Sequence, residues 1–177
     1  KQYIKGKGGL LKLNPRKKPA EAVEWFLPTG TKQYSSWQGV IIGSPSVNDK
    51  TKQKEDPSLA VCSAMDGTMY VIDYKHVEPG KMVIGTDAKT RYKTPKILAQ
   101  YAIGPSISTP IIVGNKIVAA SYGGIFLFQI EKNGTCKLMD TFVSNFEATP
   151  IVHQGKIYIA SRDGFLYCFG DEQQKGE

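Results

Sequence analysis

Short apolar segments separated by polar turns run through most of the 177-residue chain. The segments are four to seven residues long, are rich in Ile, Val, Tyr and Phe, and are bounded by Gly-Asn, Gln-Gly, Asp-Gly or Gly-Gly pairs. No stretch between them has the periodicity of an amphipathic helix. β-Branched and aromatic residues in short runs between such turns are typical of β-strands. The pattern therefore predicts an all-β protein built from hairpins.

The segments belong to a unit that repeats after 40 residues. Residues 109–121, TPIIVGNKIVAAS, are matched by residues 149–161, TPIVHQGKIYIAS. An earlier copy begins at residue 44 and is lengthened at 48–57, a polar stretch that we interpret as a hairpin loop. Each unit predicts three strands and then a fourth, which we place at residues 22–27, 97–103 and 137–143. Four antiparallel strands at this period describe a propeller blade.

Counting the units predicts a single domain over residues 1–177, an incomplete ring of about three to four four-stranded blades. The expected parts are the outer half of a blade at 1–27, blades at 43–103 and 108–143, and a last, partial blade at 148–170. An open arc would leave two apolar sheet faces exposed. Because the chain starts without Met in the middle of a blade, we expect the remaining blades on further sequence of a longer propeller. Assembly with a second copy, or with a partner, is the alternative.

Several motifs recur in register: small-Pro-hydrophobic, Gly-x-Lys-Ile-Tyr-x-x-Ser, Asp-Gly-x-Leu-Tyr, and a Trp followed five residues later by Gly. This series resembles the repeat of the pyrroloquinoline-quinone-like (PQQ-like) β-propellers, over about residues 7–170. That family includes quinoprotein alcohol dehydrogenases, the lipoprotein scaffold of the outer-membrane assembly machinery and many envelope proteins. The resemblance implies an extracytoplasmic location, and a Trp on the outer strand that docks one blade on the next. The repeat positions that match are Trp25, Gly67, Gly124, Gly164, Pro45, Pro110 and Pro150.

Charge and cysteine content add little. The chain has 23 Lys and Arg against 16 Asp and Glu, a net charge of +7, concentrated at residues 1–18 and 89–96. We interpret these basic residues as solvated strand edges and turns in preference to a nucleic-acid site. Cys62, Cys136 and Cys168 are too far apart in sequence for a metal site; one disulfide is possible and none is required. No apolar run approaches the length of a membrane span.

Candidate catalysts are few. The only histidines, His76 and His153, fall at the end of a predicted strand and at a turn. Asp66, Asp73 and Asp163 also fall at turns, where an Asp side chain bonds its own backbone, and we favour that role over a calcium or acid–base role. Quinoprotein dehydrogenases of the family carry an adjacent pair of cysteines, which this chain lacks. We therefore predict no catalytic residue, no metal and no cofactor in this chain.

Three predicted loops are longer than a blade requires: residues 30–40, 48–57 and 76–95. Tyr, Trp and Arg dominate protein-binding hot spots, and loops of a rigid fold carry many binding sites. The candidates for a binding face are Tyr34, Trp37, Lys50, Lys52, Arg91 and Tyr92. The alternative is that the first two of these only cover a blade edge.

The sequence thus predicts a non-catalytic binding or scaffold module for proteins or glycans, located in the periplasm, in the cell envelope or outside the cell. One alternative is a part of a quinoprotein dehydrogenase. Another is a propeller that flanks a separate catalytic domain. The sequence leaves the ligand and the number of blades open.

Overall fold

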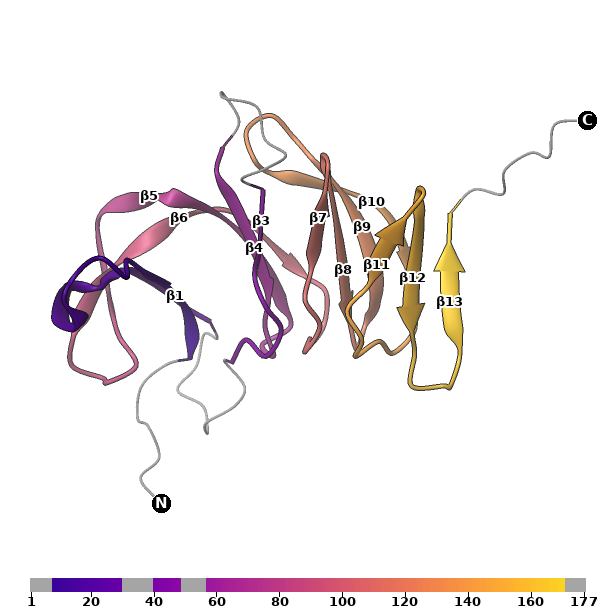
Figure 1. Cartoon of the computed structure of the whole chain (residues 1–177), viewed down its shortest axis with the longest axis horizontal. Coiled ribbons are helices and arrows are strands. Elements are labelled where there is room, and N and C mark those ends of the chain that lie inside the picture. The colour runs from indigo at the N-terminus through magenta and orange to yellow at the C-terminus, as the bar shows by residue number, and fades with distance from the viewer. Residues whose placement is uncertain (1–7, 30–39, 49–56, 171–177) are drawn as a thin grey trace, which may run out of the picture.

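The computed structural model of the chain describes residues 8–29, 40–48 and 57–170. These residues form one short 3-10 helix and thirteen strands in four sheets, in which every strand pairing is antiparallel. The predicted fold class is confirmed: the chain is an all-β propeller segment with an incomplete ring of blades. The four sheets, named A to D here, follow one another in chain order (Figure 1).

The two complete sheets are B and C, with four strands each. Sheet A consists of β1 (Gly9–Leu13), η1 (Pro19–Glu21) in the connection, and β2 (Val23–Pro28). Sheet B consists of β3 (Ser46–Val47), β4 (Leu59–Ser63), β5 (Thr68–Ile84) and β6 (Arg91–Ala102). Sheet C consists of β7 (Ile111–Val113), β8 (Lys116–Ser121), β9 (Gly124–Ile130) and β10 (Cys136–Phe142). Sheet D consists of β11 (Ile151–His153), β12 (Lys156–Ala160) and β13 (Leu166–Phe169).

The sheets pack face to face, because both faces of their middle strands are apolar. In β4, Leu59 and Val61 share one buried cluster with sheet C, whereas Ala60 and Cys62 share another with sheet A. A third cluster joins Val118 of sheet C to sheet D. Successive residues of a strand point to opposite faces, so a continuous apolar run is what a sheet covered on both sides needs.

Hydrogen bonds between blades explain the threonine before Pro110 and before Pro150. Thr109 Oγ1 accepts a bond from the Ser44 backbone N–H at 2.9 Å, and Thr149 Oγ1 accepts one from the Thr109 N–H at 3.2 Å. Each hydroxyl thus fixes the start of the preceding blade. Pro45, Pro110 and Pro150 follow these residues and lie immediately before the first strands of sheets B, C and D.

The Asp-Gly turns contain a paired aspartate and tyrosine. Tyr70 donates its hydroxyl to Asp66 at 2.6 Å, and Tyr167 donates to Asp163 at 2.6 Å, while each Asp also accepts a backbone N–H of its turn. In sheet C the turn is one residue shorter, and Phe126 stands at the position of these tyrosines. Sheet C therefore lacks both the tyrosine hydroxyl and the aspartate carboxylate that accepts its hydrogen bond.

Three glycines of the repeat hold turns that other residues adopt only with strain. Gly67 and Gly164 each have a φ of +88°, and Gly124 has a φ of +143°. A Cβ atom at Gly124 would also lie 2.5 Å from the Phe142 carbonyl oxygen. These positions therefore favour glycine for conformation, and at Gly124 for space as well.

The prediction of a loop at 76–95 is wrong. Strand β5 continues through His76 to Ile84, and β6 already begins at Arg91. The pairing survives the turn-like sequence Glu78-Pro79-Gly80 because irregular register shifts take up the unpaired residues. The resulting arm, residues 77–84 and 91–95, arches from sheet B toward sheet A (Figure 1).

The arm covers part of the outer side of sheet A. The Tyr92 ring meets the Phe26 ring edge to face with centroids 6.5 Å apart, and Phe26 is fully buried. Leu11 and Leu13, on the same sheet, stay 40% and 58% exposed. The expectation of two exposed apolar faces therefore needs correction at this end, where the chain shields one of them in part.

Candidate binding surface

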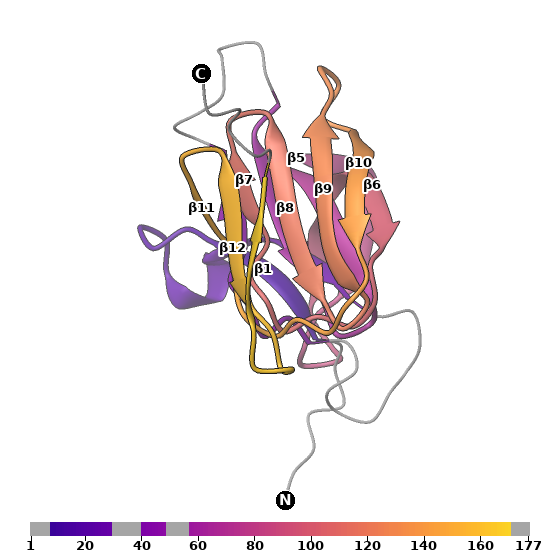
Figure 2. The same ribbon diagram turned by 90° about the vertical axis from the view of Figure 1, so that its right-hand side faces the viewer.

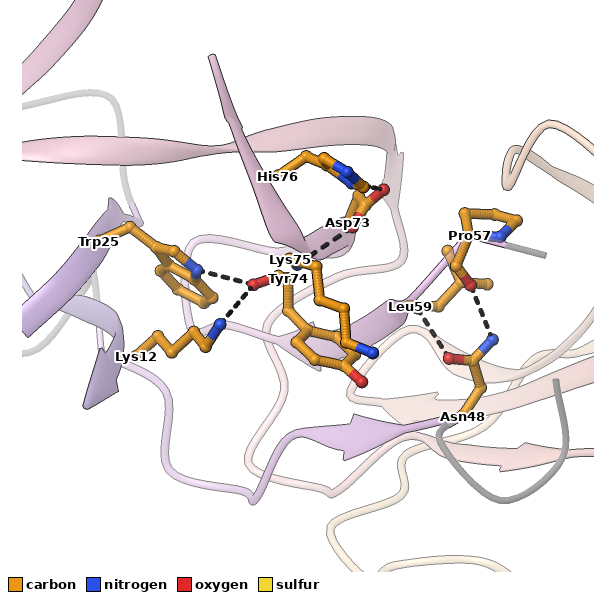
Figure 3. Close-up of polar contacts among 9 residues, drawn as sticks. All are labelled: Lys12, Trp25, Asn48, Pro57, Leu59, Asp73, Tyr74, Lys75 and His76. Atoms are coloured by element: carbon orange, nitrogen blue, oxygen red, sulfur yellow. Dashed lines mark hydrogen bonds and ion pairs between the residues drawn. The ribbon is translucent and has the colours of Figure 1, made fainter. Parts of the chain in front are cut away.

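Trp25 holds the junction between sheets A and B, as the family resemblance implied for a Trp on the outer strand. Its side chain is 3% exposed and packs against Ala60, Cys62 and Tyr70. The indole N–H donates to the Tyr74 carbonyl oxygen at 2.9 Å, and Lys12 Nζ donates to the same oxygen at 3.2 Å (Figure 3). Trp25 is therefore a packing residue that is also held by a hydrogen bond.

Asp73 and His76 contact each other at the start of the arm, where the register of β5 against β6 shifts. Asp73 is buried, and its carboxylate accepts the Lys75 backbone N–H at 3.0 Å and lies 2.7 Å from His76 Nδ1 (Figure 3). These bonds fall where β5 shifts its register against β6. The geometry gives Asp73 the turn role that its sequence context predicted.

The described candidates for a binding face lie on the arm. Arg91 is exposed opposite Ile84, whereas Tyr92 is half-buried against Phe26 and so has a packing role. Tyr34, Trp37, Lys50 and Lys52 lie outside the described residues, as does most of the predicted loop at 48–57. The binding face assembled from these six residues stays a prediction.

All three cysteines are free thiols. Burial raises the pKa of Cys62 to about 12 and that of Cys136 to about 11, so neither is a thiolate nucleophile at neutral pH. Cys168 is exposed on β13. Among the residues that the structure describes, no three His, Cys, Asp or Glu side chains gather as metal ligands.

A cleft of about 690 Å³ lies between sheets C and D. Its walls include Thr141 and Phe142 of β10, Leu127 of β9 and Phe169 of β13, together with Lys116 and Val118 of β8 and Ile157 of β12. The Phe142 ring lies 5.2 Å from that of Phe169 between centroids, and 42% of the Phe142 side chain is exposed. In Figure 2, the three strands of sheet D lie to one side of β9 and β10, which extend beyond them.

One side of the cleft lies beside β13. In sheets B and C the third strand pairs with β6 or β10, whereas β13 is the edge of its described sheet. A partial last blade at 148–170 was a prediction from the sequence. The cleft itself was not, since it depends on how far β10 projects past β13.

A second apolar surface lies on the side of sheet D that points away from sheet C. Ile151 is 65% exposed and Leu166 is 72% exposed. The equivalent of Leu166 in sheet C is Ile125, which is 5% exposed because sheet D covers it. We call Ile151, Tyr158 and Leu166 the outer D surface.

Comparisons with known proteins show no family for this chain. No family model matches the chain, and no curated protein does. Among solved structures, BamB from Moraxella catarrhalis is similar with a TM-score of 0.39 and 17% sequence identity. The match covers 84% of this chain and 50% of BamB, so the chain spans half the length of that protein. No helix in the described part of the chain is long and apolar enough to cross a membrane.

Proposed function

We propose that this chain is a non-catalytic β-propeller module that binds other proteins as a scaffold in an extracytoplasmic compartment. The observation that carries the proposal is the apolar cleft beside β13, next to the outer D surface. Exposed apolar patches that are this concentrated are typical of interaction sites. The sheets behind them are fixed by three buried clusters, so the surface is presented with little loss of conformational freedom on binding.

Cys62 and Cys136 belong to the packed sheets, where burial raises the pKa of both thiols. The extracytoplasmic location rests on the resemblance of the repeat to PQQ-like propellers. No observation on the described residues favours the alternative of a quinoprotein dehydrogenase.

The test compares the wild-type chain with Leu166→Lys, which places a charge on the outer D surface, and with Met139→Lys, a change at a 52% exposed residue outside both apolar surfaces. Proteins of the envelope fraction are cross-linked to each tagged variant, identified, and then produced singly for binding measurements. We expect at least one purified partner that binds wild type and Met139→Lys equally.

Two results would overturn the proposal. One is that no purified envelope protein binds any of the three chains. The other is dye-linked alcohol oxidation that requires both pyrroloquinoline quinone and Ca²⁺, which would make the protein an enzyme.

A further inference from the structure

One face of the arm is exposed to solvent. Met82 lies opposite Lys93, and Ile84 lies opposite Arg91, so these four side chains share one face of the two-stranded arm. Met82 is 48% exposed and Ile84 is 49% exposed, and both cations are exposed as well. We call Met82, Ile84, Arg91 and Lys93 the outer arm face. It combines two apolar side chains with two positive charges.

The opposite face of the arm is fixed to the fold. Val83 and Tyr92 lie opposite each other, on the face that alternates with the outer arm face. The Tyr92 ring contacts the Phe26 ring of sheet A, and Thr94 and Pro95 are buried at the base of the arm. The outer arm face therefore belongs to a ribbon that is anchored along its other side, so its backbone is already positioned for a partner.

A closed turn joins the two strands of the arm. The Gly85 N–H donates to the Thr90 carbonyl oxygen at 2.8 Å. Asp87 accepts the backbone N–H groups of Lys89 and Thr90 at 3.0 Å and 2.9 Å, and it also accepts the Thr90 hydroxyl. The Thr90 hydroxyl and these N–H groups lower the pKa of the Asp87 carboxyl to about 2. The carboxylate of the turn is therefore engaged by the turn itself.

The charge around the outer arm face is positive. Residues 75–96 contain six Lys and Arg side chains against two acids, Glu78 and Asp87. Glu78 is half-buried, and Asp87 is bonded within the turn. Among the described residues, neither Arg91 nor Lys93 forms an ion pair. Both cations are therefore available to carboxylates from outside the described part of the chain.

These charges indicate which kind of surface fits the face. Sheets of this chain pack on one another through uncharged side chains, as in β4, which is covered on both sides and has no charged residue. Another such sheet would bury Arg91 and Lys93 without partners, at a high cost in desolvation. Elements that bind a membrane surface commonly use Trp, Phe or Leu, whereas the apolar residues here are Met82 and Ile84. Met and Arg are enriched in protein interfaces, which favours a protein partner.

We propose that the outer arm face binds an acidic segment of a partner protein, in which carboxylates alternate with apolar side chains. The carboxylates pair with Arg91 and Lys93, and the apolar side chains cover Met82 and Ile84. Figure 1 shows the arm at the sheet A end of the molecule and sheet D at the opposite end. This surface is separate from the cleft that carries the proposed function, so either proposal can fail without the other.

The probe is a capped synthetic peptide with the sequence SDLEFEDLES. Two control peptides separate its properties, since SNLQFQNLQS has no carboxylate and SDSESEDSES has no apolar side chain. Calorimetry with the full 177-residue chain measures binding, and methyl NMR of the chain locates the peptide. We expect saturable binding of the probe, with shifts of the Met82 and Ile84 methyl signals. Each control peptide should bind about fivefold more weakly or worse.

Two variants of the chain test the face, and a third is their control. The double variant Arg91→Gln, Lys93→Gln removes both charges at exposed positions and should weaken probe binding by about fivefold or more. Ile84→Thr keeps a β-branched residue in the strand, removes apolar surface and should weaken binding by about threefold or more. Lys132→Gln combined with Lys137→Gln removes two exposed charges from the β9–β10 hairpin and should change binding by less than about twofold.

Several results would overturn this assignment: no binding of the probe, equal binding of the peptide without carboxylates, methyl shifts confined to other parts of the chain, or full binding by the double variant. Binding to phosphatidylglycerol vesicles in place of the probe, lost in the double variant, would assign the face to a membrane. Self-association of the free chain that the double variant abolishes would assign it to a second copy. A failed probe alongside a purified envelope partner that still binds the double variant would reject this face and leave the proposed function standing.

Discussion

Replacing Trp25 tests whether sheet A is held to sheet B by this one side chain. The indole is 3% exposed and packs in the cluster between the two sheets. Trp→Ala changes at buried positions cost about 3–5 kcal/mol, because they remove apolar contacts and leave a cavity. For a domain of this size that corresponds to a fall in melting temperature of roughly 6–20 °C. Far-UV circular dichroism during chemical and thermal unfolding measures both quantities.

Trp25→Phe separates packing from hydrogen bonding. The smaller ring still fills much of the site, and Lys12 Nζ continues to donate to the Tyr74 carbonyl oxygen. Losing one neutral hydrogen bond and part of the ring should cost about 1–2 kcal/mol. Met139→Ala, at a 52% exposed position, serves as the control and should change stability by less than about 0.5 kcal/mol. If Trp25→Ala costs no more than this control, the docking role is refuted.

Three further predictions concern the turns and the thiols. The Tyr167 hydroxyl and the Phe165 N–H hold the pKa of Asp163 below its ordinary value, so this pKa should rise in Tyr167→Phe, as measured by carboxyl ¹³C NMR titration. The stability that this carboxylate contributes is present above its unfolded pKa and is lost as the pH falls through the lower folded pKa. The wild type should therefore lose more stability on acidification than the variant. An unchanged Asp163 titration would contradict this. Gly124→Ala should destabilise the chain by more than about 1 kcal/mol, because the new Cβ meets the Phe142 carbonyl oxygen. The control is Gly114→Ala, which has a φ of +57° and open space around it, so it has only the conformational cost. Equal losses of stability in denaturant titrations would show that the contact with Phe142 is unimportant. Ellman's reagent should modify one thiol, Cys168, in the native chain and all three after denaturation, and rapid native modification of Cys62 would contradict the burial described for sheet B.

The repeat made most of the fold predictable, because its motifs report local chemistry. The Thr-Pro pairs at 109 and 149 mark first strands, and the Asp-Gly turns at 66 and 163 mark the hairpins that precede third strands. The arm was missed for the opposite reason. Glu78-Pro79-Gly80 is a turn signal by itself, and the contact that stabilises the arm joins Tyr92 to Phe26, which is 66 positions earlier in the chain. Local patterns contain no information about such a contact.

The candidate site was less predictable than the fold. Hot-spot composition pointed to Tyr92, yet the structure uses this ring for packing. The cleft is formed by ordinary strand residues such as Thr141 and Phe169, which have no distinguishing sequence signal. What makes them a site is their position between two neighbouring sheets, a property of the assembled stack.

The hydrogen bonds that Thr109 and Thr149 accept also have a mechanical consequence. Each hydroxyl bond joins one blade only to the preceding one, and the starts of these two blades are 40 residues apart. Tension applied between the two ends of the chain would therefore be borne by one junction after another and not shared among all of them. Under an optical trap or cantilever, the molecule should lengthen in discrete rips, with the 40-residue unit releasing roughly 130–145 Å of contour length at once.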